Sequence, residues 1–380
     1  MTILFICGSL EQGKDGVGDY TRRLAGEIIR QEHSASIISL NDKYISTIEQ
    51  TEQDADGTII PVLRLPENLS NKERYGRAGS YIQDFNPEWL SLQFVPYAFQ
   101  KKGLPLGLGK RLAKIGEGRK WHIMFHELWI RYSLLFSKRT IIESFQKYII
   151  KHLFKELSPL KVHTSNPCAG KDLKKMGITA QILPIFSNIS VYYSKKETTD
   201  DNSIFKVGFF SKFGLTVEII QYLVNLQKSL VGKNKKLAII LIGGSNEKAV
   251  DFENLLYKNL KFDFQVNHTG FLSEREVSKQ ISLLNMAISY DYRHILNKSG
   301  SVSALLLHGI PVAVPNVHPK LGPNYWGKFD DYMIKRFENV LNVNNVTLKN
   351  IHIDNNHRKL FDVAAIAINF INDLNDIKNA

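Results

Sequence analysis

A lysine that could bind a diphosphate follows an apolar run in the second half of the chain. Ser211 and Lys212 come directly after Phe205–Phe210, whose composition is typical of a buried parallel strand, and Gly243 closes the next such run, Leu237–Ile242. Ligands of open α/β sheets bind outside the carboxyl ends of the strands. We therefore expect Lys212 to approach an anionic ligand, although an exposed lysine is commonly only a solvated surface residue.

A second polar segment of this half combines positive charge with a predicted helix start. Arg293 and Lys298 precede Ser299, Gly300 and Ser301, which open a helical segment. The amides and hydroxyls at the start of a helix, together with the helix dipole, favour a phosphate. A capped helix beside a solvated basic loop explains the same residues, so both interpretations stay open.

The first half of the chain offers a glycine loop between a predicted strand, Thr2–Cys7, and a predicted helix. Gly16 and Gly18 flank Val17 in this loop, and glycine lets the backbone approach a ligand closely. The first amides of the helix would be free to bind an anion. The spacing matches neither G-x-G-x-x-G nor a P-loop, so a plain turn is the alternative.

A histidine–glutamate pair follows another predicted strand of this half. His126 and Glu127 come directly after His122–Phe125, so they are expected on the ligand side of the sheet. Either could act as an acid, act as a base or orient a hydroxyl, whereas a histidine bonded to nearby backbone is the alternative. The eleven histidines show no metal-ligand spacing, so we expect neither a metal ion nor a cofactor.

These candidate residues can lie close together only if the strands before them end at one edge of a sheet. The sequence alternates strand-like and helix-like segments throughout. Such alternation predicts parallel βαβ units and doubly wound sheets. The polar segment Val191–Ser203 has no periodicity, which is typical of a linker. We therefore expect two Rossmann-like domains, 1–188 and 189–358, followed by an amphipathic C-terminal helix, 359–380.

The composition limits the class of protein. Of the 380 residues, 43% are hydrophobic and 23% charged, which is typical of a folded globular chain and not of a disordered one. Cys7 and Cys168 are the only cysteines, which excludes a disulfide scaffold and indicates a reducing compartment. The apolar runs are too short to span a membrane, and Met1–Ser9 resembles a strand more than a signal peptide. We expect a cytoplasmic protein.

The formal net charge of +12 predicts an anionic partner. Two basic segments interleaved with apolar residues, Phe99–Arg111 and Phe136–Lys155, are compatible with an anionic membrane surface or with a solvated helix face. Nucleic acid is not expected, because the sequence holds no recognition module. Phosphorylated small molecules and a peripheral place at the inner face of the cell membrane remain open.

Taken together and in order, several short motifs resemble the GT-B glycosyltransferases, in particular the retaining enzymes of family 4. Over nearly the whole chain, the motifs that carry this resemblance are Gly16-Val17-Gly18-Asp19-Tyr20-Thr21, Asn86-Pro87-Glu88-Trp89-Leu90-Ser91-Leu92-Gln93, Phe125-His126-Glu127, Ile182-Leu183-Pro184-Ile185-Phe186-Ser187-Asn188, His268-Thr269-Gly270-Phe271-Leu272-Ser273 and Leu307-His308-Gly309-Ile310-Pro311-Val312. The resemblance implies two Rossmann-like domains that face each other across a cleft, with the terminal helix packed back on the first domain.

The resemblance also implies a function and roles for the candidates. A sugar would move from a nucleotide-diphosphate sugar to a glycan or lipid-linked glycan, with retention of configuration and without a metal, as in polysaccharide biosynthesis. The residues expected to be catalytic are His126, Lys212, Lys298 and Arg293, and Glu127 is expected to bind the acceptor. The residues expected to bind the donor are Gly16, Val17, Gly18, Ser211, Gly243, Phe271, Leu272, Ser299, Gly300 and Ser301.

The sequence departs from the family at one central position. The E-x7-E carboxylate pair of the family would fall on Leu296 and Ala304, so both carboxylates are missing. This departure supports one alternative, a non-catalytic sugar-nucleotide-binding partner of another transferase. A sugar-nucleotide epimerase of the same fold is a second alternative, and the doubled α/β pattern leaves a dinucleotide-dependent oxidoreductase as a third. The irregular glycine spacing argues against the oxidoreductase.

Overall fold

The chain forms two compact units in a computed structural model that describes all residues except 130–137, 194–202, 319–335, 338–339, 342–352 and 377–380. Unit 1 comprises Met1–Pro184 and Ile366–Ala380, and unit 2 comprises Ile185–Ala365. The sequence placed the same division at residue 188 and the start of the terminal helix at residue 359. Most of the expected linker, Val191–Ser203, lies outside the described residues.

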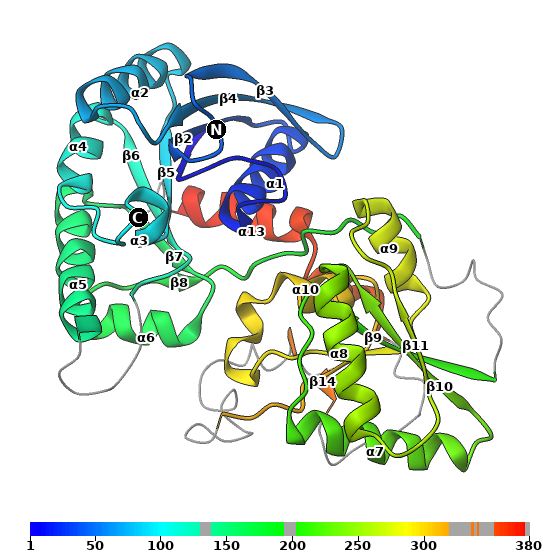
Figure 1. The fold of residues 1–380 in the computed structure, drawn as a ribbon. Helices are drawn as coiled ribbons and strands as arrows, with labels where there is room; N and C mark the ends of the chain where they lie inside the picture. Colours follow the sequence, from blue (N-terminus) through cyan, green and yellow to red (C-terminus); the bar gives the residue numbers. More distant parts are fainter. Residues whose placement is uncertain (130–137, 194–202, 319–335, 338–339, 342–352, 377–380) are drawn as a thin grey trace. The chain divides into compact units, whose positions relative to one another are not determined.

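Unit 1 contains an eight-stranded sheet in the order β3-β4-β2-β1-β5-β6-β7-β8 (Figure 1). All neighbouring strands are parallel except the hairpin of β3 and β4 at one edge. The strands are β1 (Thr2–Cys7), β2 (Ser34–Asp42), β3 (Glu49–Ala55), β4 (Thr58–Pro66), β5 (Trp89–Phe94), β6 (Lys120–Phe125), β7 (Lys161–Thr164) and β8 (Gln181–Ile182).

Helices cover both faces of this sheet. Figure 1 shows α2, α4 and α5 on one face, and α1 and α13 on the other. The helices are α1 (Gly16–Arg30), α2 (Asn71–Phe85), α3 (Pro96–Phe99), α4 (Leu108–Ile115), α5 (Lys138–Leu157), α6 (Pro167–Lys175) and α13 (Val363–Asn375). The ring of Phe370 on α13 lies 5.9 Å from that of Phe5 on β1, so the C-terminal residues complete the core of unit 1.

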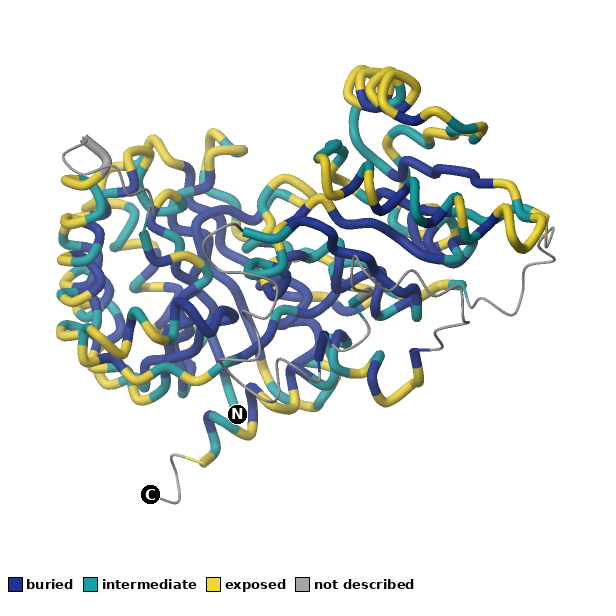
Figure 2. Tube along the Cα trace, turned by 90° about the horizontal axis from the view of Figure 1, so that it is seen from below, coloured by how far each residue is buried: buried dark blue, intermediate teal, exposed yellow. Residues whose placement is uncertain are grey.

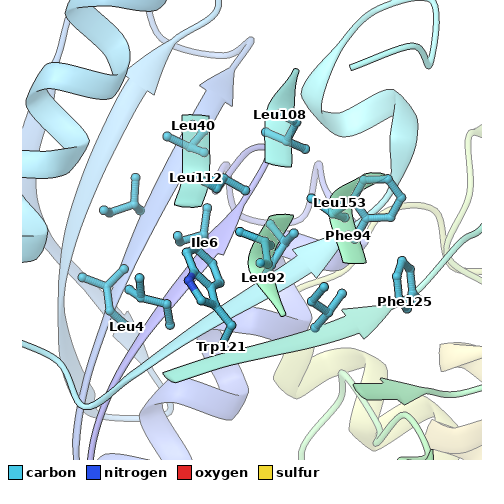
Figure 3. Close-up of a cluster of buried hydrophobic side chains, with 14 of the residues drawn as sticks. Leu4, Ile6, Leu40, Leu92, Phe94, Leu108, Leu112, Trp121, Phe125 and Leu153 are labelled. Carbon is cyan, nitrogen blue, oxygen red and sulfur yellow. The ribbon is translucent and has the colours of Figure 1, made fainter. Parts of the chain in front are cut away.

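The two faces of the unit 1 strands have different chemistry. On the α2–α4–α5 face, the strand side chains are apolar and pack with leucines of α4 and α5, as Figure 3 shows for Leu92, Phe94, Leu112 and Leu153. Their burial is nearly complete along the strands (Figure 2). The opposite face of β5, β6 and β7 carries buried polar side chains instead.

Unit 2 contains a six-stranded parallel sheet in the order β11-β10-β9-β12-β13-β14. Its strands are β9 (Ile204–Phe210), β10 (Lys236–Ile242), β11 (Gln265–His268), β12 (Met286–Ile288), β13 (Val312–Ala313) and β14 (Val340–Leu341). Its helices are α7 (Val217–Val231), α8 (Asn246–Asn259), α9 (Glu274–Ser282), η2 (Arg293–Lys298), α10 (Gly300–Leu307) and α12 (Asn355–Lys359). Ser273 and Glu276 form a capping box at the start of α9.

The structure differs from the expected elements at four places. The hairpin strand β3 is polar and lies at a sheet edge, so it lacks the apolar run by which the other strands were found. Helix α8 and helix α4 were not expected. The terminal helix, α13, begins at Val363 and not at residue 359, and a separate short helix, α12, ends at Lys359. Cys7 and Cys168 are both buried, and they form no disulfide.

Candidate functional site

Candidate residues of unit 2 gather at the carboxyl edge of its sheet. Ser211 and Lys212 follow β9, Gly243 follows β10, and Asp291 lies three residues beyond the end of β12. These three strands are adjacent and parallel, so their carboxyl ends lie along one edge. This is the edge at which ligands of open α/β sheets bind.

A carboxylate that the sequence analysis missed joins two of the predicted residues. Lys212 Nζ donates to Asp291 Oδ1 at 2.8 Å, and Ser299 Oγ donates to Asp291 Oδ2 at 2.7 Å. Asp291 is 6% exposed, whereas the side chain of Lys212 is 56% exposed. Asp291 therefore holds the lysine and the start of α10 together while the ammonium faces solvent.

The hydroxyl of Ser299 is fully used within this cluster. It donates to Asp291 and accepts from Val302 N as the N-cap of α10, so the hydroxyl of Ser301, 3.1 Å away, donates to it. The amides of Gly300 and Ser301 precede the first helical hydrogen bond. Thus the backbone of the helix start, and not the Ser299 hydroxyl, is what this end of α10 offers to a ligand.

The other two predicted cations are placed differently. Arg293 Nε donates to Val314 O at 2.9 Å, and burial lowers the pKa of its guanidinium. This contact gives Arg293 a structural task, the anchoring of η2 to the segment after β13. Lys298 is exposed at the end of η2, and no described contact joins it to Lys212.

The positions at which the family carries its glutamate pair are interior positions here. Leu296 is 1% exposed and Ala304 is fully buried. A carboxylate at either site would lose its hydration, which is costly. Asp291 is the buried carboxylate of this edge instead, but it binds Lys212 and a serine of the protein itself.

The remaining donor candidates of unit 2 follow the strands β9, β10 and β11. Phe271 is 83% exposed and Leu272 is half-buried beyond β11. Gly243 has φ +75° and donates its amide to Thr269 Oγ1 at 3.1 Å, a conformation that favours glycine. Ser211 adopts φ +69° without being glycine, which is a strained conformation of the kind found at functional sites.

The glycine loop of unit 1 does not offer the free amides that the sequence predicted. The carboxylate of Asp15 caps α1 and accepts from Val17 N at 3.1 Å and Gly18 N at 2.8 Å. An anion at these amides would compete with a carboxylate that already fills the site. Gly18 is required for packing, because a Cβ there would lie 2.4 Å from Ser9 O, whereas a Cβ at Gly16 would meet nothing within 4 Å.

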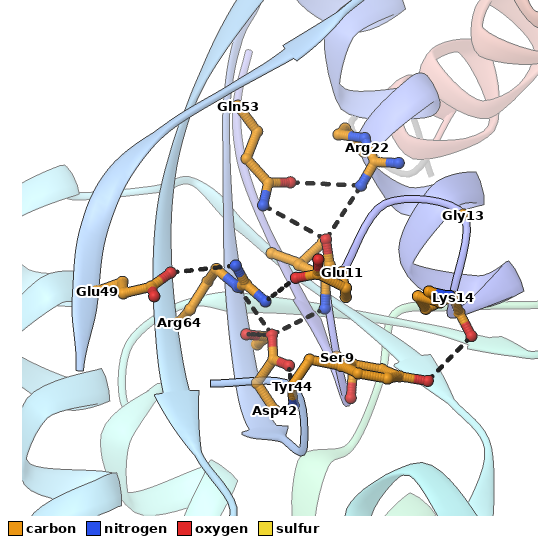
Figure 4. A network of polar contacts seen from close by, with 12 residues as sticks. Ser9, Glu11, Gly13, Lys14, Arg22, Asp42, Tyr44, Glu49, Gln53 and Arg64 are labelled. Atoms are coloured by element: carbon orange, nitrogen blue, oxygen red, sulfur yellow. Dashed lines mark hydrogen bonds and ion pairs between the residues drawn. The ribbon is translucent and has the colours of Figure 1, made fainter. Parts of the chain in front are cut away.

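Ion pairs and hydrogen bonds hold this loop to the neighbouring strands (Figure 4). Leu10 N donates to Asp42 Oδ2 at 3.0 Å, and the guanidinium of Arg22 donates to Leu10 O at 3.2 Å. Arg64 pairs with Asp42 at 2.9 Å and with Glu11 of the loop at 2.8 Å. The loop is therefore preorganised by its own polar contacts.

His126 and Glu127 lie where the sequence predicted, directly after β6. His126 Nε2 lies 2.9 Å from Gln93 Oε1, and the ring of Tyr20 packs edge-on against the imidazole at 4.9 Å. His126 is therefore held by β5 and α1, not by nearby backbone alone. Glu127 is exposed.

A cavity of about 380 Å³ lies at the carboxyl edge of the same sheet, beside β2, β4 and β5. Its wall combines Arg74, Lys101 and Arg111 with the apolar residues Leu104 and Leu106. Neither arginine forms an ion pair with a described residue, and the Nε atom of each is buried without a partner among them. Burial and the charge of Arg111 both lower the pKa of Arg74. The cavity therefore combines three basic side chains and one carboxylate, Glu67, with an apolar wall.

Neither a metal site nor a membrane-spanning helix is found among the described residues. No group of three or more His, Cys, Asp and Glu side chains there could hold a metal ion. Among the described helices, none combines the length and the apolarity that crossing a bilayer requires.

Solved structures that are similar to this chain include glycosyltransferases and synthases. A glycosyltransferase from Rickettsia africae is 14% identical over 100% of this chain and 99% of its own, with a TM-score of 0.57. A trehalose 6-phosphate synthase from Burkholderia multivorans is 9% identical over 100% and 99%, with a TM-score of 0.55. The catalytic domain of starch synthase IV from Arabidopsis thaliana, bound to ADP and acarbose, is 10% identical over 100% of both chains, with a TM-score of 0.53.

No protein-family model and no curated protein sequence matches the chain. The structural likeness therefore establishes the fold, two Rossmann-like parallel-sheet domains of the GT-B type, and confirms that expectation of the sequence.

Proposed function

We propose that the protein transfers a sugar from a nucleotide-diphosphate sugar to a glycan or lipid-linked glycan, with retention of configuration and without a metal. The observation that carries this proposal is the Lys212–Asp291–Ser299 cluster at the carboxyl edge of unit 2. The starch synthase structure, which holds ADP and acarbose on the same fold, supports a nucleoside diphosphate as the leaving group.

The chemistry of this reaction needs positive charge at the leaving group. The bond between the anomeric carbon and the diphosphate oxygen breaks, and its electron pair remains on the phosphate. The acceptor oxygen bonds to the anomeric carbon, and its proton passes to the leaving phosphate. Lys212 keeps its bond to Asp291 and uses its remaining N–H groups on the diphosphate, while the amides of Gly300 and Ser301 favour the same charge.

The remaining predicted residues take supporting roles in this proposal. Lys298 adds charge near the diphosphate, and Phe271 with Leu272 lines the nucleotide base. His126 contacts a sugar hydroxyl, and Glu127 contacts the acceptor. Gly16 is the part of the glycine loop that can approach the donor, because Val17 and Gly18 already donate to Asp15.

The cavity of unit 1 supports an acceptor that carries a phosphate and a hydrocarbon chain. Arg74 donates to Glu67 O at 2.9 Å and Arg111 donates to Leu106 O at 2.8 Å, so backbone oxygens hold both guanidinium groups at the wall. Their positive charge would attract a phosphate, while Leu104 and Leu106 offer apolar surface beside them. Leu106 is 53% exposed at the rim. A phosphate-linked lipid matches both chemistries at once, and its membrane would lie against the neighbouring exposed lysines.

Thermal unfolding with UDP, GDP, ADP, CMP and NAD, followed by donor turnover, tests the proposal. Saturation at about 100 times Kd stabilises a protein by about 2.7 kcal/mol. We expect one nucleoside diphosphate to stabilise the protein selectively, and the matching nucleotide sugar to be consumed when acceptor is present. A response to NAD alone would contradict the proposal.

A non-catalytic sugar-nucleotide-binding partner is the second candidate, and the burial of Leu296 and Ala304 favours it. Donor turnover separates the two: a partner protein binds the nucleotide sugar but does not consume it. Release of free sugar and nucleoside diphosphate without acceptor would instead indicate an epimerase of this fold.

Liposome binding tests the acceptor side. Replacing Lys101, Lys102 and Lys110 with Ser should weaken binding to vesicles that contain anionic lipid. Replacing Lys171, Lys174 and Lys175, which are exposed on α6, removes the same charge and serves as the matched control. Equal binding of both triple variants would contradict a membrane role for this surface.

A further inference from the structure

A continuous row of polar side chains crosses the interior of unit 1, on the sheet face that α13 covers. It runs from Asp373 on α13 through His163, His122, Ser91 and Gln93 to His126, and the four middle residues are 0% exposed. In that order, the five contacts measure 3.0, 3.0, 2.8, 2.8 and 2.9 Å. Only the two ends reach solvent.

The strand register explains why these side chains meet. Ser91 on β5 lies directly opposite His122 on β6, and His163 on β7 lies opposite Met124, one alternation further along β6. Side chains two residues apart on a strand share a face, so His122 and His163 are diagonal neighbours. Phe370 of α13 packs against both imidazoles, at 5.0 and 6.2 Å between ring centres.

Burial keeps both interior imidazoles neutral. It lowers the pKa of His122 well below its ordinary value, and His163 adds to this effect. The pKa of His163 is also lowered by burial, against the opposing effect of Asp373. Each neutral imidazole has one N–H donor and one acceptor nitrogen. Each therefore donates to one neighbour in the row and accepts from the other.

The carboxylate at the end of the row selects the direction of donation. Asp373 can only accept, so His163 donates through Nε2 and accepts through Nδ1. His122 then donates through Nε2 and accepts at Nδ1 from the Ser91 hydroxyl. Ser91 accepts from the Gln93 amide, and the oxygen of that amide accepts from His126 Nε2. In the reverse direction, the lone pair of His163 Nε2 would face a carboxylate oxygen at 3.0 Å.

We infer that Asp373, on the C-terminal helix, fixes His126 as the tautomer protonated at Nε2. Asp373 is thus a positioning residue that acts through five hydrogen bonds, and Nδ1 of His126 is the nitrogen that accepts. In the proposed reaction, on which this last step rests, His126 accepts a hydrogen bond from a sugar hydroxyl and does not donate one.

Nitrogen-15 NMR of histidine-labelled protein tests the inference without substrate, so its result is independent of the proposed function. In the unmodified protein, His163, His122 and His126 should each show protonation at Nε2 alone. Asp373→Asn should abolish this preference, because a carboxamide can accept from Nε2 or donate to it. Asp376→Asn removes an exposed carboxylate directly after the same helix and should leave all three histidines unchanged.

A break in the middle of the row distinguishes transmission from a general structural effect. With Ser91→Ala in place, adding Asp373→Asn should still change His163 and His122 but should no longer affect His126. The inference is wrong if His126 carries its proton on Nδ1 in the unmodified protein, or if Asp373→Asn leaves the three tautomers unchanged. It is also wrong if the Ser91→Ala background does not interrupt the effect on His126.

Discussion

Unit 1 and unit 2 each bring polar residues to a predicted ligand edge, but these residues are mainly neutral in unit 1 and charged in unit 2. In unit 1, the row from Asp373 to His126 is neutral along its buried middle, and each hydrogen bond fixes the next. In unit 2, Lys212 is charged and more than half exposed, and a buried carboxylate holds it. The first arrangement determines orientation and the second presents charge.

This difference assigns different tasks to the two units. A desolvated neutral row cannot stabilise a diphosphate, because it carries no net positive charge near His126. The exposed ammonium of Lys212 can do so, and its position costs little desolvation, since water covers most of it. We therefore expect changes in unit 2 to affect donor chemistry most strongly, and changes in unit 1 to affect orientation and stability.

The largest expected effect comes from removing the charge. Lys212→Ala should lower kcat/KM for sugar transfer by about 10²–10³, the usual loss for one preorganised charge-stabilising donor. Lys248→Ala removes an exposed lysine of α8 and is the matched control, with activity near that of the unmodified protein. Near-full activity of Lys212→Ala would contradict the role of the Lys212 charge in sugar transfer.

Acid should destabilise both units through neutral buried histidines. His308 lies between Ser278 Oγ at 2.9 Å and Ala304 O at 2.7 Å, and burial lowers its pKa to about 4. The unfolded chain binds this proton near pH 6.5 and the folded chain does not, so stability falls as the pH falls below that value. Between pH 7 and pH 5, His308 alone should cost about 2 kcal/mol.

Urea unfolding at the two pH values measures this effect, and His308→Gln is the variant that should reduce it in unit 2. His122 and His163 act in the same direction in unit 1, because their pKa values are also lowered. An unchanged free energy of unfolding between pH 7 and pH 5 would contradict the neutral state of these histidines.

The smallest expected effect concerns the glycine loop. Asp15→Ala removes the cap of α1 and should lower stability by about 1 kcal/mol, as loss of an N-cap usually does. It also frees the amides of Val17 and Gly18, so weak binding of inorganic phosphate at the loop should appear. Glu117→Ala, at an exposed turn, is the control. Phosphate binding to the unmodified loop would contradict the account in which Asp15 occupies these amides.

The sequence predicted the fold class and most strands because buried parallel strands are continuous apolar runs. Thr2–Cys7 has the predicted bounds, and Lys212 and His126 lie after the expected strands. Asp291 escaped notice because its partner Lys212 is 79 residues away in the chain, and only the pairing of β9 with β12 joins them.

The polar row was missed for the same physical reason. His163 and Asp373 are 210 residues apart. The signal in the sequence was the alternation of polar and apolar residues within β5, β6 and β7, where an inward-facing histidine needs a partner that only tertiary structure supplies.

The most direct test of the central claim is calorimetric titration of the selected nucleoside diphosphate into the unmodified protein, Lys212→Ala and Ser91→Ala. If unit 2 presents the charge, Lys212→Ala should weaken binding by about tenfold or more, which corresponds to about 1.4 kcal/mol. Ser91→Ala should bind as the unmodified protein does. Equal affinity of Lys212→Ala and the unmodified protein, or a loss confined to Ser91→Ala, would contradict the assignment of the donor to the Lys212–Asp291–Ser299 cluster.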